Sequence, residues 1–237
     1  ASYADSSASA LSSQISTLSA AAAATITNPA SVSKTVGQSH IFSASPTTAS
    51  DGGTLSYQWE SATAASPSTY SSITGATSIN YTTPTLAIGD NGSLYRVVVT
   101  NAINGTTTAA TSSAATLTVA KAPLSAPTAI TASTVSGSAT SLKIAFTNAS
   151  SATSYTARIY LASDGTTLIA TATSYTSNTA ITGLSAGTAY KVTLTSIGDA
   201  SYADSSASAL SGSISTLSAA AAATITNPAS VSKTVGD

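Results

Sequence analysis

The chain has 237 residues, of which 6% are charged and 42% are hydrophobic, and its formal net charge is −1. Ordinary soluble domains carry about 25% charged residues, so this chain lacks the basic surface that nucleic acid or an anionic membrane would require. It contains no Cys and no Met, which excludes disulfides, thiolate metal sites and cysteine nucleophiles. The longest apolar run, residues 20–24, is far too short for a membrane span of about 20 residues.

The two ends of the chain repeat each other. Residues 1–38 and 200–237 match at 35 of 38 positions, at an offset of 199 residues. The three differences are Ser13/Gly212, Gln14/Ser213 and Gln38/Asp237. Solenoid units are about 20–50 residues long, so this longer period indicates repetition of whole domains. At roughly 100–150 residues per domain, one period holds about two small domains or one large one. We expect the natural protein to continue this pattern in both directions.

Short stretches of alternating apolar and polar residues run through the chain, bounded by Gly, Asn, Asp and Pro. This pattern is typical of β-sandwiches and barrels and argues against a disordered, Ser/Thr/Ala-rich linker. In the first half we expect an edge strand in residues 24–37 and further strands at 40–44, 55–60, 79–81, 95–99 and 115–119. Turns are expected at residues 51–53, 90–92 and 104–105.

Two motifs in this half resemble those of bacterial immunoglobulin-like domains. They are LSYQWE at 55–60 and DNGSLYRVVVTN at 90–101, and the resemblance covers about residues 24–120. It implies that Trp59 is the buried Trp of the third strand, and that Tyr95 is a tyrosine-corner residue whose hydroxyl bonds to the preceding loop. Val97 occupies the position of the second Cys of antibody domains, so packing must replace the disulfide there.

The second half predicts a second set of strands, around residues 130–132, 142–146, 155–161, 168–170, 181, 190–194 and within 205–217. Leu184, Gly187, Thr188 and Tyr190 resemble the turn and tyrosine corner of fibronectin type III domains, and this resemblance covers about residues 124–217. It implies that Leu184 and Tyr190 belong to the core. Phe146 stands where that family usually has a Trp on its second strand, which is a departure from the pattern.

We therefore predict an all-β protein of two tandem antiparallel β-sandwiches, an immunoglobulin-like domain at residues 24–120 and a fibronectin type III-like domain at 127–217. Residues 19–23 and 121–126 are predicted linkers. By the repeat, residues 1–18 are the last strand of a preceding fibronectin-like domain, and residues 218–237 are the first strand of the next immunoglobulin-like domain. Such orphan strands leave apolar residues and ladder groups without partners, so we expect contact with another copy or with the rest of the array to complete them.

No set of residues in the sequence predicts a catalytic, cofactor or metal site. His40 is the only histidine, and a triad or a metal site needs several partners. Asp199 and Asp204 lie where a calcium ion would be best placed, but calcium needs about six oxygens at one site. Lys143 and Lys191 alternate with apolar residues, which places them on the outer face and disfavours a Lys–Asn isopeptide cross-link. We expect no enzyme activity and no cofactor.

Exposed aromatic rings could indicate a sugar-binding surface. Trp59, Tyr95 and Tyr190 are already assigned to the core or to tyrosine corners. The remaining candidates are Tyr3 and its repeat Tyr202, Tyr70, Tyr160 and Tyr175. They form no cluster along the sequence, so we interpret them as scattered surface tyrosines.

The sequence thus predicts a structural repeat of a long extracellular fibre, stalk or adhesin, which acts as a stiff spacer and can self-associate. Its expected partners are further copies of the same repeat, in the same chain or in neighbouring chains. The resemblances imply a bacterial protein at the cell surface, with any glycan or host ligand bound elsewhere in it. Two alternatives stay open. One is a subunit that polymerises by strand complementation between chains. The other is a carbohydrate-binding or host-protein-binding module of an adhesin or secreted enzyme.

Overall fold

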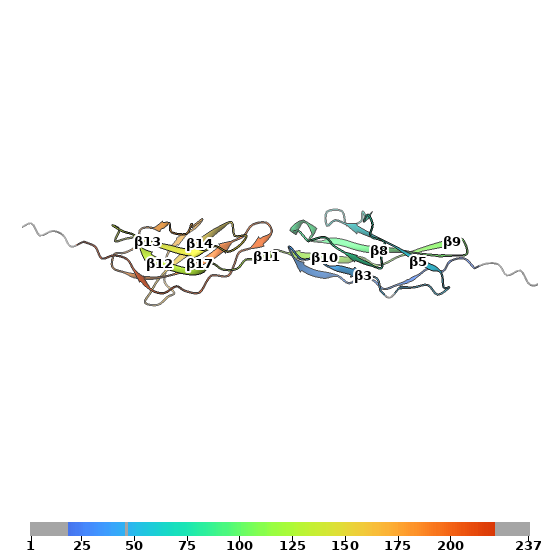
Figure 1. Cartoon of the computed structure of the whole chain (residues 1–237), viewed down its shortest axis with the longest axis horizontal. Coiled ribbons are helices and arrows are strands. Elements are labelled where there is room, and N and C mark those ends of the chain that lie inside the picture. Colours follow the sequence, from blue (N-terminus) through green and yellow to red (C-terminus); the bar gives the residue numbers. More distant parts are fainter. Residues whose placement is uncertain (1–18, 46, 221–237) are drawn as a thin grey trace, which may run out of the picture. The chain divides into compact units, whose positions relative to one another are not determined.

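The computed structural model describes residues 19–45 and 47–220, and the chain divides into two compact units, Ala1–Lys121 and Ala122–Asp237. The predicted orphan strands, residues 1–18 and 218–237, lie outside the described residues except for residues 218–220. Within the described part, strands dominate and the only helix is one short 3-10 turn, η1 (Ile88–Asp90). The structure therefore confirms the predicted all-β class, and each unit has its own set of strands (Figure 1).

The first unit consists of one large sheet and two short strand pairs. Its strands are β1 (Thr25–Ile26), β2 (Val32–Thr35), β3 (Ile41–Ser43), β4 (Thr47–Thr48), β5 (Thr54–Ala62), β6 (Ser71–Ser72), β7 (Asn80–Thr82), β8 (Ser93–Ile103), β9 (Thr106–Thr111) and β10 (Ala115–Ala120). The large sheet has the order β2-β10-β8-β5-β6, with β9 also paired to β8, while β3 pairs with β7 and β1 with β4. β5 and β8, side by side in Figure 1, form its longest antiparallel pair, and β2 runs parallel to β10.

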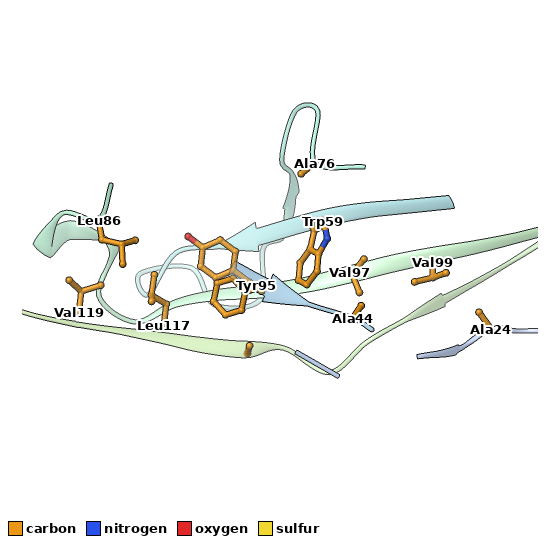
Figure 2. Close-up of a cluster of buried hydrophobic side chains, with 12 residues drawn as sticks. Ala24, Ala44, Trp59, Ala76, Leu86, Tyr95, Val97, Val99, Leu117 and Val119 are labelled. Atoms are coloured by element: carbon orange, nitrogen blue, oxygen red, sulfur yellow. The ribbon is translucent and has the colours of Figure 1, made fainter. Parts of the chain in front are cut away.

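The core of the first unit lies between the large sheet and the β3–β7 pair. Along β8, buried residues alternate with half-buried ones from Ser93 to Asn101, as a strand with one covered face requires. Trp59 of β5 and Val97 of β8 are cross-strand neighbours with no exposed surface. Figure 2 shows Leu86, Leu117 and Val119 gathered at one end of this cluster and Val99 toward the other.

The second unit is a sandwich of a three-stranded and a four-stranded sheet. Its strands are β11 (Ala122–Pro123), β12 (Thr128–Thr134), β13 (Leu142–Thr147), β14 (Ser154–Leu161), β15 (Leu168–Ala172), β16 (Ala180–Ile181), β17 (Ala189–Ile197), β18 (Tyr202–Ala203) and β19 (Ile214–Ser215). The sheets have the orders β12-β13-β16 and β15-β14-β17-β19. Their facing sides bury Ile144 and Ile159, together with Val192 and Leu194 of β17.

Two predicted strands differ from the structure. The edge strand expected in residues 24–37 is divided into β1 and β2, which pair with different sheets, and Pro29 lies between them. Proline has no N–H for a ladder and is disfavoured inside a strand. The last strand expected within residues 205–217 is regular only at β19, because residues 205–211 are bonded in another way, described below.

The only tryptophan tests the position of the first core. Trp59→Ala is expected to lower the free energy of unfolding of the first unit by about 3–5 kcal/mol, because it leaves a cavity where a fully buried ring was packed. Chemical denaturation followed by NMR signals of each unit separately measures this. Thr118→Ala, on the exposed face of β10, is the matched control and should change stability by less than about 0.5 kcal/mol. An unchanged midpoint for Trp59→Ala contradicts the placement.

Candidate functional site

The segment that enters the first unit is tied to it by a polar cluster, which we call the entry anchor and define as Asp51, Asn101, Thr106 and Thr108. The Ala21 N–H donates to Thr106 Oγ1, and the Thr108 hydroxyl donates to the Ala21 carbonyl, both at 2.7 Å. These bonds span more than 80 residues of sequence. Residues 19–23, predicted as a linker, are therefore partly bonded to the first sandwich.

Asn101 and Asp51 hold the next residue of that segment. The Ala22 N–H donates to Asp51 Oδ2 at 2.7 Å, and Asn101 Nδ2 donates to the Ala22 carbonyl at 2.9 Å and to both Asp51 oxygens. Asn101 has no exposed surface. Its Oδ1 lies so close to Gly53 that a Cβ there would be 2.1 Å from it, and only glycine fits. Among the described residues, this Oδ1 has no hydrogen-bond donor.

The hydrogen bonds to Asp51 favour its ionised form. The Ala22 N–H contributes most, followed by the Asn101 amide and the Gly53 N–H, and together they lower the pKa of Asp51 to about 2. Desolvation acts in the opposite direction but is weaker. The ionised Asp51 carboxylate is thus the acceptor that holds these backbone and amide N–H groups.

The segment that leaves the second unit is held by three serines, Ser205, Ser208 and Ser211, which we call the serine ladder. Each serine donates its N–H to a carbonyl of β17, and each hydroxyl oxygen accepts the N–H of that same β17 residue. The carbonyl bonds measure 2.8–2.9 Å and the hydroxyl bonds 2.9–3.0 Å; the β17 partners are Ser196, Leu194 and Val192. Each hydroxyl also donates to the carbonyl of the residue that follows it, at 2.8–2.9 Å.

The ladder pairs every third residue with every second residue of β17. Two strand residues span about 6.8 Å, so three residues of the ladder segment cover that length and cannot be fully extended. This is why no regular strand forms over residues 205–211. Ser112 makes the same double bond with Val97 in the first unit, where the two N–H donors lie 3.0 Å from their acceptors.

Beyond the ladder, Thr216 and Leu217 complete the exit. The Thr188 N–H donates to Thr216 Oγ1 at 3.1 Å, and the Thr216 hydroxyl donates to the Ser185 carbonyl at 2.7 Å. The Gly187 N–H donates to the Leu217 carbonyl at 3.0 Å. The hydroxyl oxygen of Tyr190 accepts the Ser185 N–H at 3.0 Å, which forms the tyrosine corner that the fibronectin resemblance implies.

The six predicted core residues differ in how deeply they are buried. Trp59 donates its Nε1–H to the Ser78 carbonyl at 2.9 Å. The buried ones are Trp59, Tyr95, Val97, Leu184 and Tyr190. Phe146 is half-buried and packs edge-on against Tyr155, with ring centroids 4.7 Å apart.

Tyr95 does not form the corner that the immunoglobulin resemblance implies. Its ring stacks on Phe42 with centroids 4.6 Å apart, and burial, with smaller contributions from Tyr81 and Asp90, raises its pKa to about 12. No hydrogen bond from its hydroxyl to the preceding loop is found among the described residues. Asp90 instead accepts the Ala87 N–H and closes that loop itself. Phe42, Tyr95 and Val97 belong to the same buried cluster.

The other candidates have local structural roles. His40 packs edge-on against Phe42 at 4.7 Å, and burial, followed by the charge of Lys34, lowers its pKa. Asp199 accepts the N–H groups of Ser201 and Tyr202, and Asp204 accepts that of Gly198. Lys143 and Lys191 are half-exposed and alternate with buried neighbours. In residues 19–45 and 47–220, no group of three or more acidic or histidine side chains is placed to hold a metal ion.

One tyrosine expected at the surface is buried. Tyr175 is 5% exposed, and its hydroxyl oxygen accepts the Ile144 N–H at 2.9 Å. It lies behind a hollow of about 540 Å³ lined by loops 148–155 and 174–177. Tyr155, the other ring there, is 7% exposed, so neither ring has a face free for stacking on a sugar. Tyr160 and Tyr202 are half-buried. Tyr70 is covered by Arg96, 3.7 Å from its ring centroid, and Tyr3 lies outside the described residues.

Comparisons with known proteins do not assign the chain to a family. No protein-family model and no curated sequence matches the chain. Among solved structures, it is similar to the FN1-FN3 domains of chicken CNTN1, with 14% identity, a TM-score of 0.37 and coverage of 80% of this chain. It is similar to domains from titin, with 15% identity, a TM-score of 0.37 and 82% coverage. The chain spans 66% of each of those structures, just under two thirds.

The strand order and the bonded ends therefore define the class of protein. It is an all-β protein of two tandem, mainly antiparallel β-sandwiches, and the described segments that enter the first and leave the second are hydrogen-bonded to them. Within the described residues, no helix is long and apolar enough to cross a membrane.

The serine ladder generates a stability prediction. Ser208→Ala removes the acceptor of the Leu194 N–H, a group behind a fully buried side chain, and should destabilise the second unit by about 1–3 kcal/mol. Ser208→Thr, which keeps the hydroxyl, should recover most of the loss. Ser206→Ala, an exposed neighbour, is the matched control. Thermal unfolding of the three variants measures the effect, and equal stability of Ser208→Ala and Ser206→Ala would show that the hydroxyl bond contributes nothing.

The entry anchor predicts a dependence on pH. Because the folded-state pKa of Asp51 is about 2 and its ordinary value is 3.8, the anchor's contribution is complete above pH about 4 and is lost as pH falls toward 2. Amide exchange at Ala22, corrected for intrinsic rates, should accelerate over this range. Asp51→Asn keeps an acceptor oxygen but does not titrate, so its Ala22 exchange should stay flat. A carboxyl-carbon titration of Asp51 with a midpoint near 4 would contradict the anchor.

Proposed function

We propose that this chain is a structural repeat of a long extracellular fibre, stalk or adhesin at the cell surface, in which each sandwich serves as a stiff spacer. The observation that supports the proposal is the bonding of both connecting segments. The entry anchor holds Ala21 and Ala22 on the first unit, and Gly187 holds Leu217 on the second. Spacer domains need such ties, because free linkers of Gly and Ser behave as flexible coils.

The surface chemistry supports the same role. The low charge leaves little repulsion between neighbouring copies, and the absence of Cys and Met removes the side chains that oxidation damages first. Its partners, in this proposal, are further copies of the repeat. The edge strand β15 carries no charged residue, and its Leu168 and Ile169 are 51% and 44% exposed. An uncharged, apolar edge favours side-by-side association of neighbouring arrays.

Imaging of the native assembly tests the proposal. A sandwich strand of about eight residues spans roughly 26 Å, so one period of two sandwiches with their loops should advance a fibre by roughly 70–80 Å. Electron microscopy of the native surface, with antibodies against this chain, should show label at that axial spacing along filaments. Side-by-side filaments in the same images would support the lateral contact. Label confined to the cell interior, or lacking an axial repeat, would overturn the spacer role.

A further inference from the structure

The repeat makes it possible to observe one sequence in two surroundings. Residues 15–37 precede and enter the first unit. Residues 214–236, which follow the second unit's β17, are the second copy of this 23-residue segment. Apart from numbering, residues 15–37 and 214–236 are identical. The structure describes the first part of this segment on the second unit, as residues 214–217, and the next part on the first unit, as residues 19–26.

On the second unit, the described part is bonded up to Leu217. Ile214 and Ser215 pair with Tyr190 and Ala189 of β17. The Thr216 N–H donates to the Thr188 carbonyl at 3.0 Å, and the last bond is that from the Gly187 N–H to the Leu217 carbonyl.

On the first unit, the bonding begins one residue further along the shared sequence, at Ser19, whose carbonyl accepts a hydrogen bond from Asn104 Nδ2 at 3.3 Å. Ala21, which corresponds to Ala220, is the first residue bonded through both its N–H and its carbonyl. Ala22 follows, held by Asp51 and Asn101. Ala21 and Ala24 are each 8% exposed, so these two alanines pack on the sandwich, whereas Ala20 and Ala23 are exposed.

We propose that residues 214–224 form a shared junction, whose first part completes the fibronectin-like unit and whose second part docks on the entry anchor of the next immunoglobulin-like unit. This deepens the proposed function by naming the partner at each junction, and it rests on the chain continuing its period. Ser218, the counterpart of Ser19, follows Leu217 directly, so the two bonded parts are adjacent in the sequence. From Leu217 to Ala220 is three Cα steps, about 10–11 Å when extended, which holds successive periods close together.

The connection between the two units of this chain is equally short. The Val36 N–H donates to the Ala120 carbonyl within the first unit, and the Ala122 N–H donates to the Ser201 carbonyl within the second, both at 3.0 Å. Lys121 alone separates these two bonded residues in the sequence. This connection is thus flanked by hydrogen bonds within each unit.

The experiment adds a third unit to the intact chain by joining residues 39–121 after Asp237. Because the chain has no Cys, spin labels can be placed at one exposed position on each side of the junction, through Ser163→Cys and through Ser68→Cys in the added copy only. Electron paramagnetic resonance then measures the distribution of distances between them. We expect a single narrow distribution, and a broad one after four Gly residues are inserted between Ser218 and Ala219.

Amide exchange gives an independent measure of docking. In the extended chain, exchange at Ala220 and Ala221 should be slower by about tenfold or more than in the 237-residue chain. Asn101→Ala in the added copy alone should remove this protection, while Thr118→Ala in that copy should leave it. The insertion variant alters neither sandwich, so the test does not depend on whether Asn101→Ala folds.

Each result decides the proposal. Equally broad distance distributions with and without the insertion would overturn the shared junction, and so would fast amide exchange at Ala220 and Ala221. The spacer role would then still be tested separately, by the axial spacing in the electron microscopy images. The two experiments separate the two proposals. An axial repeat without a stiff junction would overturn only the shared junction, and a stiff junction without native filaments would overturn only the spacer role.

Discussion

The pairing of side-chain hydroxyls with strand N–H groups is the interaction on which the second sandwich depends. β17 contributes Tyr190, Val192 and Leu194 to the core, and the backbone groups on its edge opposite β14 need hydrogen-bond partners. A buried N–H without an acceptor costs about as much as a lost hydrogen bond. The serine ladder supplies an acceptor at each of these positions while its own hydroxyls are satisfied by the next carbonyl. Beyond its pairing with β19, this edge of β17 is therefore bonded at Val192, Leu194 and Ser196 without a regular partner strand.

This arrangement also shows a structural role for some of the abundant Ser and Thr side chains. A hydroxyl can accept one hydrogen bond and donate another. The hydroxyls of Ser112 and the serine ladder therefore accept the strand N–H groups that the carbonyls of a regular partner strand would accept. The repeat carries serines at the corresponding positions, Ser6, Ser9 and Ser12. Thr216 uses the same property to connect the last strand to the turn that contains Ser185. The exit of the sandwich and the closure of its core are thus parts of one hydrogen-bonded segment.

The entry anchor solves a different problem at the other end of the period. An alanine segment has no side-chain groups of its own that can fix its position, so the sandwich must provide them. Asp51 and Asn101 come from a turn and from the central strand β8, and they meet only because Gly53 allows Asn101 to approach the backbone. The unpaired Asn101 Oδ1 is a local cost of that approach. In return, the chain that enters the unit is bonded on both of its backbone edges.

The sequence by itself determined the all-β class, the presence of two sandwiches and the buried faces of β5, β8 and β17, because alternation with period two is local and is read residue by residue. The positions of Trp59, Val97 and Tyr190 follow from it. A serine at every third position was also visible, but a search for period two passes over it. Only the tertiary structure decided that Tyr175 is buried, that the Tyr95 hydroxyl leaves the corner to Asp90, and that Ala21 is bonded to Thr106. These outcomes depend on partners brought together from distant parts of the chain, where local pattern carries no information.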